Sequence, residues 1–142
     1  MYGSTMAGIA FTAARLGNVH CMVRPLEEKY PLSHGLACAV LLPHVIRFNF
    51  SACPAKFRQI AQGMGLDVQG MNDDEAGKRL VEGVQELNKD IGVPMLLKGI
   101  QVQSEDVREM AKVCAKTAYN QWNPRYTEEE DFRQIFEMAL QV

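Results

Sequence analysis

The amino-acid sequence predicts an all-α domain, and three observations support this. Apolar residues recur at helical spacing through most of the chain. Several segments begin with residues that typically cap helices. No two β-branched runs are placed so that they could form a hairpin. The 142 residues fit one domain, so we expect a single helical bundle over residues 1–142.

The first half of the chain predicts three helices. Residues 3–20 are small and apolar at nearly helical spacing, which predicts a helix that ends at His20. Residues 34–50 are apolar almost all round, as in a buried central helix, although Pro43 should kink it or end it early. Residues 54–65 predict a short amphipathic helix closed by glycine.

The second half predicts three more helices, each with a capping residue at its start. Asn72 begins the first, and Glu75 three residues later is typical of a capping box. Ser104 is the expected cap of the second helix. Thr127 is the expected cap of the third, with Glu130 in the capping-box position.

Composition and charge narrow the class of protein. Hydrophobic residues make up 47% and charged residues 23%, with a formal net charge of -2. This balance is ordinary for a soluble globular protein and predicts no nucleic-acid partner. No apolar run approaches the ~20 residues that span a bilayer, so we expect no membrane association. The four cysteines are irregularly spaced, which favours reduced thiols and a cytoplasmic location.

Two histidines raise the question of a metal site. His20 and His34 flank a Pro-containing loop between two predicted helices. Imidazole is a common ligand of zinc and iron, but a workable site needs three or four ligands. Cys38 lies four residues after His34 and would share its helix face, so it is a candidate third ligand. The alternatives are histidines that satisfy local hydrogen bonds and a cysteine that fills the core.

Three stretches resemble the C-terminal helical domain of the iron-containing alcohol dehydrogenases, the dehydroquinate synthase-like α domain. The first is "GIAFTAARLGNVHCMVRPLEEKYPLSHGLACAVLLPHVIRFN"; "LNKDIGVPMLLKGIQV" and "WNPRYTEEEDFRQIFEMAL" extend the resemblance over essentially the whole chain. The resemblance implies one divalent metal, usually Fe²⁺ and sometimes Zn²⁺, that acts as a Lewis acid during NAD(P)-dependent hydride transfer. Family members hold it with one Asp and three His, two of which resemble His20 and His34.

The chain lacks other parts of the family pattern. No histidine precedes His20, and the first aspartate is Asp67, so the upstream Asp and His ligands have no counterpart in order. No glycine-rich nucleotide-binding segment occurs either. Arg24 stands where the family commonly has a further histidine, and Cys38 stands where it has asparagine. We therefore expect a domain that is incomplete at its N-terminus, without the α/β domain that binds NAD(P), and we assign it no catalytic or cofactor-binding residue.

Three functional interpretations follow. The chain could be a truncated relative that is inactive by itself, or one subunit of a split dehydrogenase completed by an NAD-binding partner chain. It could also be a repurposed metal- or protein-binding module, in which His20, His34 and Cys38 form a three-ligand site suited to Zn²⁺. The apolar first helix already looks like the middle of a larger structure, so we also predict a homo-oligomer that covers its exposed apolar helices.

Overall fold

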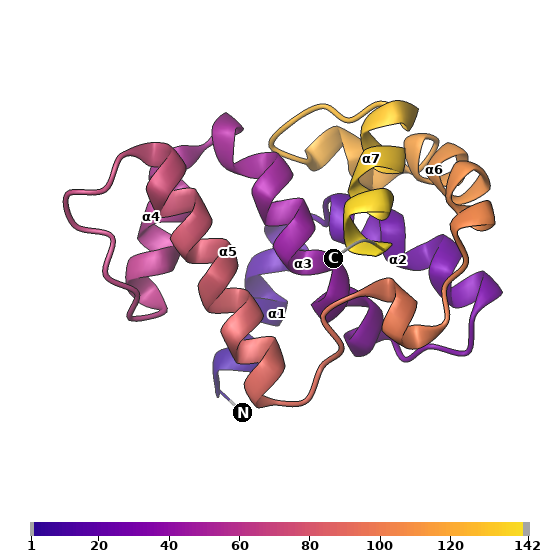
Figure 1. Cartoon of the computed structure of the whole chain (residues 1–142). Helices are drawn as coiled ribbons and strands as arrows, with labels where there is room; N and C mark the ends of the chain where they lie inside the picture. Colours follow the sequence, from indigo (N-terminus) through magenta and orange to yellow (C-terminus); the bar gives the residue numbers. More distant parts are fainter. Residues whose placement is uncertain (1, 141–142) are drawn as a thin grey trace.

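The computed structural model describes residues 2–140, and these form helices joined by short turns, with no strand among them. This confirms the predicted all-α class (Figure 1). The α-helices are α1 (Tyr2–Ala14), α2 (Asn18–Lys29), α3 (His34–Asn49), α4 (Pro54–Gly63), α5 (Asp73–Asp90), α6 (Val107–Ala115) and α7 (Glu129–Leu140). Short 3-10 helices are η1 (Phe50–Ala52), η2 (Leu97–Ile100), η3 (Ser104–Asp106) and η4 (Ala118–Trp122).

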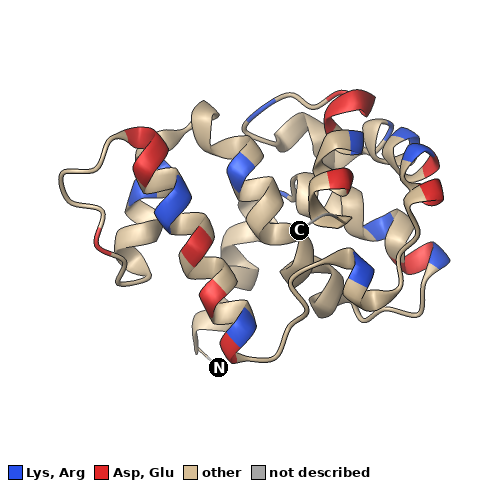
Figure 2. Cartoon of the chain, viewed as in Figure 1, with Lys and Arg blue, Asp and Glu red and all other residues tan. Residues whose placement is uncertain are grey.

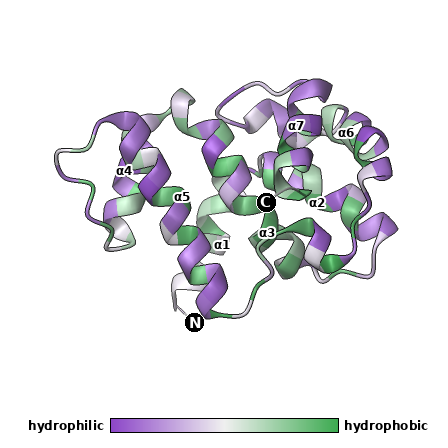
Figure 3. Ribbon diagram, viewed as in Figure 1, coloured by the Kyte–Doolittle hydropathy of each residue, from purple (hydrophilic) through white to green (hydrophobic). Residues whose placement is uncertain are grey.

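Helix α3 lies at the centre of the fold and contributes to two hydrophobic clusters. It packs against α2 and α7 on one side and against α5 on the other (Figure 1). The larger cluster joins α2, the first half of α3, α6 and α7, and the smaller one joins the end of α3 with α4 and α5. In Figure 3, α3 carries hydrophobic residues along much of its length. The predicted buried central helix is confirmed.

By length and composition alone, α3 with η1 could also cross a membrane. Residues His34–Ala52 form a helical run of 19 residues, and an 18-residue window within it has a mean hydropathy of 1.3. This apolar run is longer than we expected from the sequence. In the fold, 56% of that window is buried by other helices. The core helix of a soluble protein passes the same test, so this feature is weak support for a membrane span.

Helix α1 stands apart from the packed helices. It has no buried residue and no charged one, and Figure 2 shows it in tan throughout. Its large hydrophobic side chains face outward; Tyr2 is 90% exposed and Ile9 is 70% exposed. An apolar helix with this much surface in water is unusual for a chain that folds and functions by itself.

A break at residues 15–17 corrects the prediction of one helix over residues 3–20. Arg15 adopts a left-handed backbone conformation with φ of 69°, which ends α1. Its guanidinium lies over the ring of Trp122, 5.9 Å from the centroid. Gly17 then serves as the N-cap of α2. His20 therefore lies in the first turn of α2, not at the end of a helix.

Pro43 lies inside α3 and does not end it, contrary to one of the two expected outcomes. A proline has no N–H, so the carbonyl four residues earlier loses its helical partner. That carbonyl belongs to Ala39, and the side-chain amide of Asn88 donates to it at 2.7 Å. Asn88 is a buried residue of α5, so packing of α5 on α3 supplies the missing donor.

Pro25 inside α2 also frees a backbone carbonyl, and a side chain from another helix again supplies the hydrogen bond. The carbonyl freed there is that of Cys21, and the thiol of Cys114 donates to it at 3.2 Å. Burial raises the pKa of the Cys114 thiol strongly, so this group keeps the proton that it donates. Because α2 runs through Pro25 to Lys29, the expected Pro-containing loop shortens to residues 30–33.

The predicted helix starts have mixed outcomes. Asn72 and Glu75 form the expected capping box of α5. Ser104 instead begins a 3-10 turn, and α6 starts only at Val107, so that prediction is wrong. The predicted capping box of Thr127 and Glu130 is wrong. α7 begins at Glu129, and Asp131 rather than Glu130 accepts the backbone N–H of Glu128. The hydroxyl of Thr127 instead donates to the carbonyl of Arg125 and accepts from Asn18.

Candidate metal centre

The position of His20 depends on the first turn of α2, which is hydrogen-bonded to Asn123. The first backbone N–H groups of a helix have no helical acceptor and need another partner. The side-chain oxygen of Asn123 accepts from the backbone N–H of Asn18 at 3.2 Å. A Cβ at Gly17 would lie 3.0 Å from that oxygen, so glycine allows the close approach. The beginning of α2, and with it His20, is thereby fixed to the loop around Asn123.

Asn123 also ties this loop to the end of α3. Its side chain and that of Asn49 exchange two amide hydrogen bonds, of 2.9 and 2.7 Å. The amide of Asn18 donates to the hydroxyl of buried Thr127 at 2.6 Å. The sequence "NPR" by itself indicates only an ordinary turn. Its role in positioning the histidine helix depends on contacts with residues 74 and 105 positions away, which local patterns cannot reveal.

His34 is placed by the start of α3. The hydroxyl of Ser33, the N-cap, accepts from the backbone N–H of Leu36 at 3.4 Å. The turn over residues 30–33 is short, so it returns the chain from α2 directly onto α3. The imidazole rings of His20 and His34 lie with their centroids 5.2 Å apart. The short turn between α2 and α3 therefore brings the two histidines together.

A third donor atom completes the group. The sulfur of Cys38 lies 3.6 Å from Nε2 of His34, one helical turn along α3. One ligand atom from each of His20, His34 and Cys38 lies within 4.8 Å of the others. Bond lengths to zinc are ~2.0–2.3 Å, so atoms around one ion are ~3–4 Å apart. Small rotamer shifts would bring all three donors onto one ion.

Glu27 orients His34 from the end of α2. Its carboxylate lies 2.9 Å from Nδ1 of His34. A carboxylate only accepts hydrogen bonds, so Nδ1 carries the proton and donates it. Nε2 is then left with a free lone pair, and it is Nε2 that faces the sulfur of Cys38. This carboxylate–imidazole arrangement is typical of the outer shell of protein metal sites.

The charge states of the other two donors follow from burial. Burial, and then the neighbouring His34, lowers the pKa of His20, against a smaller opposing effect of Glu27. His20 is therefore neutral at pH 7, as a metal ligand must be. Burial raises the pKa of the Cys38 thiol, and Glu27 raises it further. Cys38 is thus a protonated thiol and not an activated nucleophile.

The guanidinium of Arg24 is paired with a carboxylate and does not present an unpaired positive charge to His20, His34 and Cys38. Its Nε lies 3.1 Å from the carboxylate of Glu28, and both side chains are mostly exposed. The hollow beside His20 and His34 is lined in addition by Arg24, Glu27, Phe11 and Tyr119, among other residues. Solvent and Glu28 therefore screen the positive charge of Arg24 from the candidate ligands.

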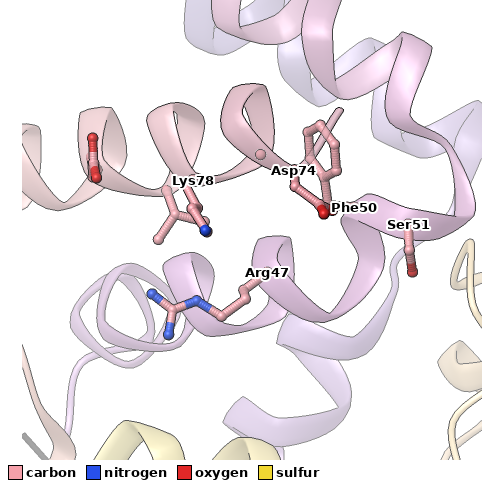
Figure 4. A pocket seen from close by; sticks show the side chains of 8 residues that line it. Arg47, Phe50, Ser51, Asp74 and Lys78 are labelled. Carbon is pink, nitrogen blue, oxygen red and sulfur yellow. The ribbon is translucent and has the colours of Figure 1, made fainter. Parts of the chain in front are cut away.

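A second hollow lies between α3 and α5, away from the histidine pair. Its lining includes Arg47, Phe50, Asp74, Lys78 and Glu82. Figure 4 shows Arg47 and Lys78 extending into the space between the helices, with Phe50 and Asp74 at one end. Cations and carboxylates are mixed on its rim, and no histidine or cysteine lines it. The candidate metal centre is therefore the group around His34.

The comparison with protein families decides the identity of this fold. The sequence model described as "Fe-containing alcohol dehydrogenase family, C-terminal" matches residues 1–140. The chain belongs to this family. The resemblance seen in the sequence is thus confirmed, and so is the all-α C-terminal architecture.

Individual members of the family are similar along nearly the whole chain. The 1,3-propanediol dehydrogenase of Klebsiella pneumoniae is 39% identical over 98% of the chain and 36% of its own length. The lactaldehyde reductase of Escherichia coli (strain K12) is 39% identical over 96% of the chain and likewise 36% of its own length. The chain therefore spans about a third of the length of the curated relatives it matches.

Solved structures of iron-type dehydrogenases superpose on the same region. A 1,3-propanediol oxidoreductase matches with a TM-score of 0.94 at 39% identity, over 98% of this chain and 36% of its own. The alcohol dehydrogenase from Oenococcus oeni matches with a TM-score of 0.90 at 35% identity, over 94% of this chain and 35% of its own. The helices described above thus have the arrangement of the corresponding third of these dehydrogenases.

Proposed function

We propose that this chain is the metal-holding helical part of an iron-type alcohol dehydrogenase, and that it performs no hydride transfer by itself. The observation that supports the first half is the pair His20 and His34, whose rings meet at the junction of α2 and α3. The second half is supported by the extent of the match, which covers only 36% of the relatives' length.

The donor set fits a divalent metal. It offers two imidazole nitrogens and a sulfur within reach of one ion, on a partly exposed surface. His20 and His34 would hold the ion, which when bound supplies Lewis-acid polarisation of an alcohol or carbonyl oxygen. Glu27 keeps the proton on Nδ1 of His34 and so presents Nε2 to the site. The Asn123 network keeps the first turn of α2, and with it His20, in place.

Residues 2–140 offer a donor set for a metal but no comparable site for NAD(P). A dinucleotide site uses a strand, a glycine-rich turn and a helix N-terminus, and residues 2–140 contain no strand. One relative, at 34% identity, is described as an NAD-dependent methanol dehydrogenase. We therefore propose that NAD(P) is bound by a separate part, either a further segment or a partner chain. The substrate class would be alcohols and aldehydes, as the names of the relatives suggest.

The exposed face of α1 is the proposed contact with that nucleotide-binding part. The face is apolar and uncharged, and about two thirds of each relative's length has no counterpart in this chain. Phe11 of α1 also lines the hollow beside His20. A partner on this face would therefore cover the apolar surface and close the metal centre in one step. A second copy of the chain would cover the surface without supplying the cofactor.

Metal binding and turnover by the purified chain test this proposal. Titration with Zn²⁺, and with Fe²⁺ under anaerobic conditions, should show one ion per chain. The double substitution of His20→Ala and His34→Ala should weaken binding by more than the ~10–100-fold that loss of an outer-shell partner costs. His44→Gln is the control, because His44 is buried in α3 away from the site.

Two results would contradict the proposal. Metal binding that is unchanged in the double variant would exclude the histidine pair as ligands. NAD(H) turnover by the isolated chain would show that no further part is needed. Turnover that appears only when an NAD-binding partner chain is added would identify a split dehydrogenase.

A further inference from the structure

Besides the two histidines, the candidate metal centre contains a third possible ligand, the sulfur of Cys38. The sulfur of Cys38 lies 3.6 Å from Nε2 of His34 and belongs to the same group of ligand atoms as His20. We propose that Cys38 is a metal ligand and makes this a three-ligand site, His20–His34–Cys38, that suits Zn²⁺. The inference rests on the proposed function, since it refines the ligand set of the same site.

The position of Cys38 on its helix supports a ligand role over a packing role. Cys38 follows His34 by four residues, so both side chains lie on one face of α3, next to His20 of α2. Cys21 and Cys114 are fully buried in the core, whereas Cys38 is half-buried at the rim beside His20 and His34. Cys38 also packs against the edge of the larger hydrophobic cluster, but its sulfur faces Nε2 of His34 at the surface, which a packing role alone does not require.

Glu27 gives the site a preformed orientation. Its carboxylate fixes the proton of His34 on Nδ1. The free lone pair on Nε2 therefore points to the side on which Cys38 and His20 lie. Three ligand directions converge before any ion arrives, so binding needs little reordering of the chain.

The chemistry of the three donors determines the preferred metal. Thiolate and imidazole together suit Zn²⁺, whereas Mg²⁺ and Mn²⁺ prefer oxygen ligands. Three protein ligands leave the fourth tetrahedral position open, as in catalytic zinc sites. Binding replaces the S–H bond of Cys38 with an S–Zn bond, and the proton leaves to solvent. One proton is therefore released for each ion bound.

Cobalt is a suitable probe, because a thiolate bound to Co²⁺ produces a charge-transfer band in the near ultraviolet. The full chain is titrated with Co²⁺ alone, and Zn²⁺ is then used to displace it. The expected result is one Co²⁺ per chain with the band present. Cys38→Ser should remove the band and weaken Zn²⁺ binding at least tenfold. Glu27→Gln should keep the band and weaken Zn²⁺ binding by about 10–100-fold.

Cys53→Ser is the matched control, because Cys53 is another half-buried free cysteine and lies outside the ligand group. It should behave as the unsubstituted chain. A second measurement needs no variant: X-ray absorption of the zinc-loaded chain should show one sulfur among the nearest neighbours of zinc.

The outcomes separate this inference from the proposed function. One bound ion without the band and without a sulfur neighbour would overturn the role of Cys38 and leave the histidine pair intact. A band that survives Cys38→Ser would also overturn it, because another cysteine would then supply the sulfur. Failure of the chain to bind either ion would refute the proposed function and this inference together.

Discussion

Helices α1 and α3 are both apolar, yet one is exposed and the other is the centre of the fold. α3 buries eight of its residues, including Val40 and Leu41, against helices on both sides. α1 buries none, although it carries no charged side chain, whereas α3 carries Arg47 in its last turn. Apolar composition therefore predicts that a helix needs to be covered. It does not predict what covers it, because the covering surface can come from anywhere in the assembly.

The comparison also concerns function, because each helix borders the candidate metal centre. α3 contributes His34 and Cys38 from its N-terminal end, where burial of the helix begins at Ala37. α1 contributes Phe11 to the adjoining hollow from a helix that has no packed partner. The candidate ligands thus lie on helices that pack into the larger hydrophobic cluster. Phe11, by contrast, lies on a helix that has no buried residue. The proposed site would therefore hold metal before α1 is covered.

The largest expected difference between the two helices is in core packing. Leu41→Ala in α3 should lower the free energy of unfolding by ~2–5 kcal/mol, because Leu41 is fully buried. Leu42→Ala, at the next position and 38% exposed, should cost much less. Urea unfolding monitored by circular dichroism measures both changes. Similar losses at the two positions would show that α3 is not packed as described.

His44 gives α3 a pH dependence that α1 does not have. Burial, and then the charge of Arg47, lowers the pKa of His44 from 6.5 to about 4. Between these pH values the unfolded chain binds a proton that the folded chain does not, so stability falls as pH falls from 6.5 to 4. The total loss is about 3 kcal/mol. Urea unfolding at several pH values measures how the free energy of unfolding depends on pH. This dependence should be weaker in His44→Gln than in the unsubstituted chain; an identical dependence would contradict this account.

The bond between Asn88 and Ala39 can be tested together with Pro43. Asn88→Leu should cost ~1–3 kcal/mol, because it leaves the carbonyl of Ala39 buried without a donor. Pro43→Ala restores a backbone N–H that can reach the same carbonyl. The double variant should therefore lose less stability than Asn88→Leu alone. Simple addition of the two effects in a double-mutant cycle would show that the two residues do not share this carbonyl.

Substitutions in α1 should have the smallest effect on stability and a clear effect on association. Met6→Glu with Ile9→Glu should change the free energy of unfolding by no more than about 0.5 kcal/mol, since both side chains are exposed. The same pair should reduce self-association, because charges on a contact face oppose its burial. Light scattering measures the mass of both forms. A monomeric chain before substitution would contradict the predicted homo-oligomer.

Local patterns in the sequence were enough to predict the helical class and the central buried helix, and they indicated His20, His34 and Cys38 as candidate metal ligands, which stays a prediction. The patterns are apolar periodicity, the Asn72 capping box, and the spacing of His20, His34 and Cys38 along neighbouring helices. The family resemblance was also visible in the sequence, because it rests on long motifs such as "ARLGNVH". None of these predictions required knowledge of which residues, far apart in the sequence, are in contact in the fold.

Where helices break and where they continue depends instead on tertiary contacts. Pro43 and Pro25 look like helix breakers in the sequence, but Asn88 and Cys114, 49 and 93 residues from the carbonyls they bind, supply the missing donors. The start of α2 depends in the same way on Asn123. Backbone groups must be satisfied wherever they are buried. Whether a local break is tolerated is therefore settled by contacts that form only when the chain is folded.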